Sequence, residues 1–268
     1  MPAPVTLLGL PTDINSSHLR GPAKGPAAAR AQLNSDAYGL TTEGGVDLAD
    51  PAVFRDVGDL ALTETTADLD LIADGVAAVL RQGPGLFIGG DHFVTWPILE
   101  GLRRAGLPPP QILHIDAHPD LYPTYDDNPH SHASPFARIL ENGLCAGLTQ
   151  VGIRATNAIH HRQSDRYGVK VFSARQVAKA MANLPTGPVY ISIDLDGLDP
   201  AFAPGVSHQE PGGLSVREVL DLIDQLPGPV IGADVVELNP DCDLGQMTAN
   251  LAAKLIKELA GRMAGDRV

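Results

Sequence analysis

Cysteine, aromatic side chains and positive charge are scarce in this sequence. Only two cysteines, Cys145 and Cys242, occur in 268 residues, and neither has a second cysteine at the spacing of a metal finger. Two cysteines are too few for a disulfide framework, so we expect reduced thiols in a cytoplasmic protein. Aromatic residues make up 4% of the chain, and we interpret them, including the single tryptophan Trp96, as packing residues.

Basic residues are outnumbered by acidic ones. The chain has 19 Lys and Arg against 32 Asp and Glu, which gives a formal net charge of −13 and a pI near 4.9. A polyanion or an anionic membrane would find little positive charge to bind, so we expect no nucleic-acid partner and no membrane partner. No apolar run approaches the roughly 20 residues that a membrane span needs, and the first residues lack the basic flank of a signal peptide.

The sequence does contain a regular alternation of short apolar runs and amphipathic stretches. Runs rich in Val, Ile and Leu lie at residues 5–10, 53–57, 86–89, 111–115, 149–153, 169–172, 189–195 and 230–236. We interpret these runs as buried strands. Apolar residues at helical spacing lie between most of them, for example in residues 69–80, 219–226 and 251–259. The alternation predicts a three-layer α/β fold with a parallel sheet of about eight strands, and we expect residues 1–268 to form a single domain.

Charged side chains follow four of the apolar runs directly. In open α/β sheets, ligands bind outside the carboxyl ends of the strands, so these side chains are the first candidates for a functional site. They are His92 after the run at 85–88, Asp116, His118 and Asp120 after 111–115, Asp194 and Asp196 after 189–193, and Glu237 after 230–236.

Residue types at these strand ends indicate a metal centre. Residues two apart on an extended segment point the same way, so Asp116, His118 and Asp120 can face one point, and Asp194 and Asp196 can do the same. Four carboxylates in one cleft repel one another unless protons or cations neutralise them. Two divalent ions balance them, and a bridging hydroxide leaves one negative charge, which suits a cationic substrate. Carboxylate and imidazole donors without a thiolate favour Mn²⁺, although Co²⁺, Ni²⁺, Fe²⁺ or Zn²⁺ accepts the same donors.

Each fragment alone has an ordinary structural explanation. An Asp-Xaa-His segment is typical of a solvated turn, Asp91 can cap a helix, and Asp199 is expected in a turn. We interpret His114, which lies inside an apolar run, as a core histidine. Because three strand ends carry all the ligands in register, we favour a dinuclear metal site over a coincidence of loops.

Five segments carry a resemblance to a known family. They are GGDH at 89–92, DAHPD at 116–120, SHASPF at 131–136, SIDLDGLDPAFAPG at 192–205 and GADVVELNP at 232–240. Together they resemble the ureohydrolase family of arginases and agmatinases, and the stretches DAHPDLY, SHASPFARI and PGVSHQEPGGLS look most like plant arginases. The resemblance covers essentially the whole chain.

This resemblance implies a fold, an assembly and a set of metal ligands. The implied fold has eight parallel strands between helices, the implied assembly is a homotrimer or homohexamer, and the implied cofactor is two Mn²⁺ per chain. One ion would be held by His92, Asp116, Asp120 and Asp194, and the other by Asp116, His118, Asp194 and Asp196.

The resemblance also implies roles in the hydrolysis of a guanidino substrate. Asp120 would accept a hydrogen bond from the attacking hydroxide, Glu237 would pair with the guanidinium, and His132 would carry a proton to the leaving amine. Urea and an amine would be released. Capping of the helix that begins near Ser134 is the alternative role for His132.

Residues for the far end of the substrate are less clearly indicated. Animal arginases have an acidic residue near the position of Asn157. They have a threonine at the position of His208, where plant-type sequences, like this chain, have a histidine. Asp126 and Asp127 would repel a carboxylate, whereas Asn128, His130 and Ser131 offer it neutral hydrogen-bond donors. We favour L-arginine as the substrate. The alternative substrates are agmatine and 4-guanidinobutyrate. The alternative to an enzyme is a catalytically silent homologue that acts as a scaffold or sensor.

Overall fold

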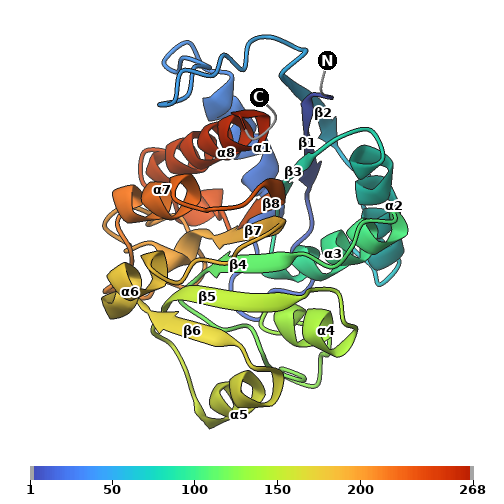
Figure 1. Ribbon diagram of the computed structural model, residues 1–268, viewed down its shortest axis with the longest axis vertical. Helices are drawn as coiled ribbons and strands as arrows, with labels where there is room; N and C mark the ends of the chain where they lie inside the picture. The colour runs from blue at the N-terminus through green and yellow to red at the C-terminus, as the bar shows by residue number, and fades with distance from the viewer. Residues whose placement is uncertain (1–2, 266–268) are drawn as a thin grey trace.

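The computed structural model describes residues 3–265 and contains one sheet of eight strands. Every neighbouring pair of strands is parallel, and their spatial order is β2-β1-β3-β8-β7-β4-β5-β6 (Figure 1). The strands are β1 Val5–Leu10, β2 Phe54–Asp59, β3 Gly85–Gly89, β4 Gln111–Ile115, β5 Gly147–Ile153, β6 Lys170–Ser173, β7 Val189–Asp194 and β8 Val230–Val236. The parallel sheet of about eight strands that the apolar runs predict is confirmed.

Helices cover both faces of this sheet. They are α1 Gly25–Leu33, α2 Asp68–Leu80, α3 Thr95–Arg104, α4 Pro135–Glu141, α5 Ala158–Tyr167, α6 Val177–Met181, α7 Val216–Asp224 and α8 Met247–Gly265. Helices α1, α6, α7 and α8 share one hydrophobic core with the sheet, and α2, α3 and α4 share a second core on the opposite face (Figure 1). The expected three layers are therefore present.

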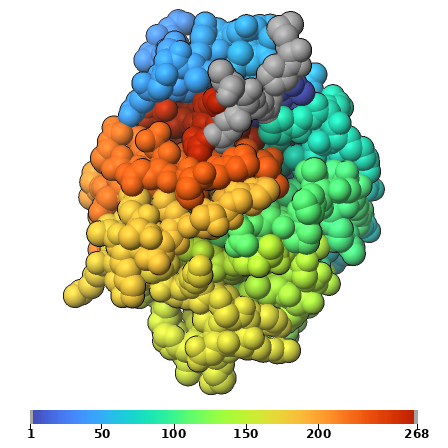
Figure 2. Space-filling view, in the orientation of Figure 1, coloured from blue at the N-terminus to red at the C-terminus, as the bar shows by residue number. Residues whose placement is uncertain are grey.

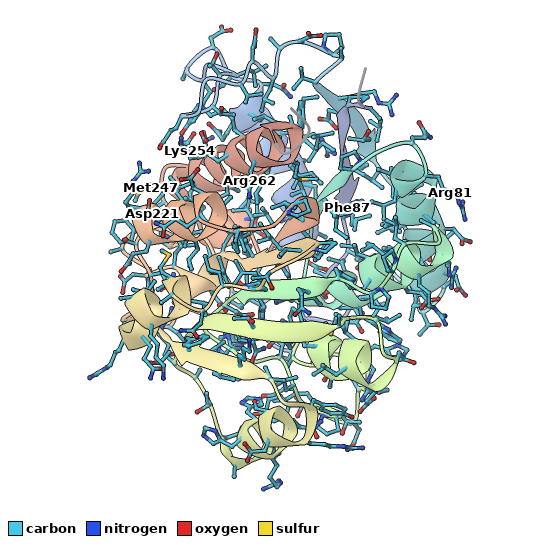
Figure 3. The ribbon with its side chains drawn as sticks, viewed as in Figure 1. Arg81, Phe87, Asp221, Met247, Lys254 and Arg262 are labelled. Atoms are coloured by element: carbon cyan, nitrogen blue, oxygen red, sulfur yellow. The ribbon has the colours of Figure 1, made fainter. Side chains whose placement is uncertain are left out.

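Alternation along the strands divides the apolar side chains between these two cores. In β4, Ile112 belongs to the core under α2 and α3, whereas Leu113 belongs to the core under α7 and α8. Phe87 of β3 is fully buried on the first side and lies inside the molecule in Figure 3, while Arg81, just after α2, lies at its periphery. Strands that are apolar on both faces are thus explained by helices on both sides of the sheet.

The two edge strands correct one expectation. Most residues of β2 are exposed, and β6 is half exposed, although the corresponding apolar runs predict buried strands. Each has only one neighbouring strand, and β2 carries Arg55, Asp56 and Asp59. Charged side chains are common on edge strands, where they discourage pairing with another chain.

A loop segment and a helix form the two ends of the molecule. The segment 34–53 lies at one end of the elongated shape and α5 lies at the other (Figures 1 and 2). Among residues 3–265, no helix has the length and apolar character that a membrane crossing requires.

Candidate metal centre and its cavity

Four neighbouring strands bring the predicted metal ligands to one edge of the sheet. Strands β3, β8, β7 and β4 are adjacent in that order, so their carboxyl ends lie side by side. The chain leaves β3 through a short 3₁₀ turn, His92–Val94, and leaves β7 through a second one, Leu195–Gly197. Asp91 caps the first turn by accepting the backbone N–H of Phe93, which confirms the capping role expected for it.

His92 is oriented by hydrogen bonds behind its ring. The Ser192 hydroxyl lies 2.7 Å from Asp234 Oδ1 and donates to it, so it accepts from His92 Nε2 at 3.0 Å. The Nδ1 atom of His92 then carries a lone pair, and it makes no hydrogen bond among the residues that the structure describes. Three carboxylate oxygens lie 3.0 to 3.2 Å from this atom, from Asp116, Asp120 and Asp194.

A lone pair that faces three carboxylates requires positive charge between them. Burial lowers the pKa of His92, but the three carboxylates outweigh burial and hold the pKa well above its ordinary value. A proton on Nδ1 is one source of that charge. A divalent cation is another, and the buried, unpaired Nδ1 with oxygen donors around it fits a cation.

A second group of donors shares Asp116 with the first. The Nδ1 atom of His118 lies 3.0 Å from Asp196 Oδ2 and 3.4 Å from Asp116 Oδ1, while Asp116 Oδ2 faces His92. Asp116, His118 and Asp196 each offer a ligand atom within 4.8 Å of the others. Asp116 therefore lies between two groups that can each hold a cation.

His114 supports Asp116 from inside the sheet. Its Nδ1 accepts from the Gln150 amide at 3.0 Å, so its Nε2 donates to Asp116 Oδ2 at 2.8 Å. Burial lowers the pKa of His114, which keeps the imidazole neutral. The interpretation of His114 as a hydrogen-bonded core histidine is confirmed, and its effect is to fix the orientation of Asp116.

Repulsion among the carboxylates appears in their pKa values. Burial, followed by the charges of Asp196 and Asp116, raises the pKa of Asp194 well above its ordinary range. Burial and Asp116 raise the pKa of Asp196 to about 7. Positive charge placed among these carboxyl groups would relieve their repulsion, which fits a cation site.

Two of the predicted catalytic residues have an unusual backbone conformation. Asp120 has φ of 51° and Glu237 has φ of 65°, in the left-handed region that non-glycine residues seldom occupy. Glu237 is held there by its N–H, which donates to the Gly90 carbonyl at 2.8 Å, and by its Oε1, which accepts the N–H of His92 at 2.9 Å. Such local strain is typical of residues that a site must aim in one direction.

Glu237, His132 and Ser17 form a chain of hydrogen bonds. His132 Nδ1 donates to Glu237 Oε1 at 2.9 Å, and its Nε2 lies 2.8 Å from the Ser17 hydroxyl. Burial lowers the pKa of His132, but the charge and hydrogen bond of Glu237, together with the charges of Asp91 and Asp120, outweigh burial and raise the pKa to about 9. Burial acts to raise the pKa of Glu237, but the charge and hydrogen bond of His132, together with the N–H and charge of His92, lower it below its ordinary value. Glu237 is therefore anionic at neutral pH.

A cavity with a volume of about 320 Å³ lies above these groups. Seven of the predicted site residues line it, namely His118, Asp120, His132, Asn157, Asp196, His208 and Glu237. Among residues 3–265, the lining does not include Asn128, His130 or Ser131. The structure thus brings the predicted ligands and catalytic residues to one place, but not all of the predicted substrate-binding residues.

Asn128, His130 and Ser131 have contacts outside the described cavity lining. Asn128 donates to the Asn15 side chain at 3.1 Å and accepts from the N–H of His130. The His130 ring packs against Phe93 and Trp96, with ring centroids 6.0 and 5.2 Å apart. Ser131 is buried. A substrate-binding role for these three residues stays a prediction.

Some lining residues were not identified from the sequence. Tyr122 lies two positions after Asp120, and the same alternation that selects Asp120 points to it. His160 is buried beside the cavity and neither of its ring nitrogens has a hydrogen-bond partner among the described residues. Ser17 comes from the loop after β1, and no local signal in the sequence indicates it.

Comparisons with known proteins agree with this geometry. A profile of the arginase family matches residues 3–261. The chain is 44% identical to arginase 1, mitochondrial, from Arabidopsis thaliana, over 98% of this chain and 82% of the relative. It is 37% identical to the N(1)-aminopropylagmatine ureohydrolase of Thermus thermophilus, over 97% and 90% of the two chains. The solved arginase from Medicago truncatula superposes with a TM-score of 0.92 at 39% identity, over 97% of this chain and 87% of that one.

These relatives also correct the expected location. Most of the plant relatives are named as mitochondrial or as chloroplastic and mitochondrial proteins, which contradicts the prediction of a cytoplasmic protein. Cysteine content does not distinguish these compartments, so the location inferred from it was wrong.

Proposed function

Because the chain belongs to the arginase family, we propose that this hydrolase cleaves L-arginine to L-ornithine and urea. The observation that carries the proposal is the lone pair of His92 Nδ1 among three carboxylates, one of which, Asp120, lines the same cavity as Glu237. A cation site joined to a buried anionic carboxylate suits a small cationic guanidino substrate. Identities of 41 to 44% with several plant arginases support arginine as that substrate.

Two Mn²⁺ ions per chain are the cofactors that the donor set supports best. Carboxylate and imidazole donors without a thiolate favour this metal. The proposed ligands of one ion are His92, Asp116, Asp120 and Asp194, and those of the other are Asp116, His118, Asp194 and Asp196. When bound, the ions supply a water of lowered pKa as the nucleophile.

Glu237 is suited to hold the guanidinium. Its Oε1 already accepts from His92 N–H and His132, whereas Oε2 has no hydrogen bond among residues 3–265 and belongs to a side chain that lines the cavity. The lowered pKa keeps the carboxylate charged. An anionic Oε2 would bind a guanidinium N–H and place the guanidinium carbon over the metal ligands.

His132 is suited to deliver a proton to the leaving amine. Its Nδ1 is occupied by Glu237, so the proton to be delivered is on Nε2, beside Ser17. Asp120, whose carboxylate lies 3.0 Å from His92, would accept a hydrogen bond from the attacking water. His208 lines the cavity beside His132, with ring centroids 5.3 Å apart, and would close the wall around the guanidinium.

Two coarser features complete the proposal. We propose that residues 1–268 form a single ureohydrolase domain, which the continuous sheet and the family match over residues 3–261 support. We also propose a homotrimer or homohexamer, as the family resemblance implies. Light scattering of the purified protein would distinguish these assemblies from a monomer.

A urea-release assay tests the proposed reaction. The purified protein, loaded with Mn²⁺, is assayed with arginine, agmatine, 4-guanidinobutyrate, guanidine and N(1)-aminopropylagmatine, and its metal content is measured in parallel. We expect the highest kcat/KM for arginine and two ions per chain. A kcat/KM for agmatine tenfold or more above that for arginine, about 1.4 kcal/mol in transition-state binding, would reject the arginase assignment.

An agmatinase-type activity is the second candidate. The cavity lining contains no Lys or Arg among residues 3–265, so no fixed cation offsets the substrate carboxylate that arginine has and agmatine lacks. The Thermus relative is named for an agmatine derivative. If the purified protein holds its metal ions but releases urea from none of these substrates, it is a catalytically silent homologue.

A further inference from the structure

The outer part of the cavity contains a hydrogen-bond donor that its neighbours orient. Tyr122 lines the cavity, and its phenol oxygen lies 2.5 Å from the side-chain amide nitrogen of Asn157, at the exposed end of the site. Two questions decide what this pair can bind: which way the Asn157 amide points, and where the Tyr122 hydroxyl hydrogen then points.

Helix α5 fixes the orientation of the Asn157 amide. Asn157 is the N-cap of this helix, and its Oδ1 accepts the backbone N–H groups of Ile159 at 2.9 Å and His160 at 3.2 Å. Backbone N–H groups only donate, so the atom that faces them is the amide oxygen. The atom that faces Tyr122 is therefore the NH₂ group, which donates.

The Tyr122 hydroxyl consequently accepts from Asn157 and keeps its own hydrogen for another partner. Among residues 3–265, this hydroxyl makes no other hydrogen bond. The Tyr122 ring is held from two sides by edge-to-face contacts with Tyr125 and His160, whose ring centroids lie 5.0 and 4.3 Å away. A hydroxyl with a fixed ring and an occupied acceptor site is a directed donor.

We propose that the Tyr122 hydroxyl donates a hydrogen bond to the carboxylate of an amino-acid substrate, and that Asn157 sets its direction. This inference rests on the proposed function, because it concerns the end of the substrate opposite the guanidinium. It assigns the carboxylate to Tyr122 rather than to Asn128, His130 or Ser131, which are not in the cavity lining among the described residues.

Charge near the cavity mouth is compatible with this assignment. Asp126 and Asp127 occupy the tip of a tight turn closed by hydrogen bonds between Tyr125 and Asn128, and neither belongs to the described lining. Both aspartates are exposed, so water and salt screen their repulsion of a carboxylate. A neutral donor such as a phenol binds a carboxylate by a charge-assisted hydrogen bond.

Two variants and two substrates test the proposal. Arginine and agmatine differ only in the carboxylate, so each variant is assayed with both. Tyr122→Phe should lower kcat/KM for arginine about tenfold, mainly through KM, and change kcat/KM for agmatine less than about twofold. Asn157→Asp keeps the helix cap, since Asp caps as well as Asn, but its carboxylate accepts the Tyr122 hydrogen. That variant should therefore weaken arginine hydrolysis more than agmatine hydrolysis, so the ratio of kcat/KM for arginine to kcat/KM for agmatine should fall.

Product binding supplies a readout that does not depend on turnover. Calorimetric titration with L-ornithine, which has the carboxylate, and putrescine, which lacks it, should show weaker ornithine binding in Tyr122→Phe and unchanged putrescine binding. Tyr167→Phe removes a hydroxyl at the far end of α5 and is the matched control, because it should affect neither ligand.

The outcomes separate the two proposals. Equal losses for arginine and agmatine in Tyr122→Phe, or no loss for either, would overturn the assignment of Tyr122. Urea release from neither substrate by the wild-type protein would overturn the proposed function, and the ornithine and putrescine titrations would still decide whether Tyr122 recognises a carboxylate.

Discussion

The floor and the mouth of the cavity are built in different ways. On the floor, formed by Asp116, Asp120, Asp194 and Asp196, buried neighbours hold the carboxylates. Asp116 accepts the His118 N–H at 2.5 Å and the His114 imidazole at 2.8 Å, and Asp194 accepts the Asp196 N–H at 2.8 Å. At the mouth, the Tyr122 hydroxyl is oriented by another side chain, that of Asn157. Floor residues are almost completely buried, whereas the mouth is formed by half-buried and exposed residues of loops.

This difference indicates how each region responds to substitution. At a buried strand end the packed surroundings leave no room for another side chain to move in. Substitution of such a carboxylate therefore removes a metal ligand that no neighbour replaces. A side chain at the mouth is held by one or two contacts and is exchanged at smaller cost. Catalysis should therefore depend on the floor, and discrimination between substrates on the mouth.

The largest expected effect is on the floor. Asp194→Ala removes a carboxylate that lies 3.2 Å from His92 and that would contact both ions, so we expect loss of both metals and a fall in kcat of about 10⁴-fold or more. Elemental analysis and urea release measure the two effects. His92→Asn should mainly weaken one ion. Full activity in metal-free Asp194→Ala would contradict the dinuclear mechanism.

The second largest effect is expected for His132, which lies between the floor and the mouth of the cavity. His132→Asn should lower kcat by about 10²- to 10⁴-fold and change KM little. The pKa of about 9 means that His132 is protonated below pH 9 and loses its proton above it. The wild-type rate should therefore fall as pH rises through about 9, and the variant should lack that decline. His161→Asn, an exposed histidine on α5, is the control. An unchanged kcat in His132→Asn would exclude proton delivery.

Ser17 should have a smaller effect of the same kind. Ser17→Ala removes the hydroxyl 2.8 Å from His132 Nε2, and the loss of one hydrogen bond is expected to lower kcat about 3- to 10-fold. If Ser17 acts through His132, the substitution should have no further effect in the His132→Asn background. Multiplicative losses in the double variant would indicate an independent role.

The smallest effect is expected at the outermost turn. Asp126 and Asp127 have φ of 49° and 59°, a conformation that Asn also tolerates, so Asp126→Asn and Asp127→Asn should fold normally. Because both charges are exposed, each substitution should change KM for arginine by less than about twofold. A larger fall in KM would show that these carboxylates repel the substrate and that the mouth extends as far as this turn.

The same comparison explains what the sequence predicts. His92, Asp116 and Asp194 follow apolar runs directly, and parallel strands place such residues at one edge, so alternation and strand order suffice to locate them. Tyr122 and Asn157 are 35 residues apart and meet only because two loops fold towards each other. No pattern in the sequence of either loop predicts the contact between these two side chains. The exposed β2 likewise follows from its position at the sheet edge, which composition does not reveal.

Backbone strain at Asp120 has a consequence for protein engineering. A left-handed conformation costs a non-glycine residue about 1 kcal/mol, and glycine avoids that cost. Asp120→Gly also removes one of four neighbouring carboxylates, which repel one another when no cation is bound. A selection for thermal stability alone, carried out in the presence of a chelator, should therefore enrich this substitution, while a selection for urea release should eliminate it. The two criteria favour opposite residues at position 120, so stability and activity have to be selected together in this protein.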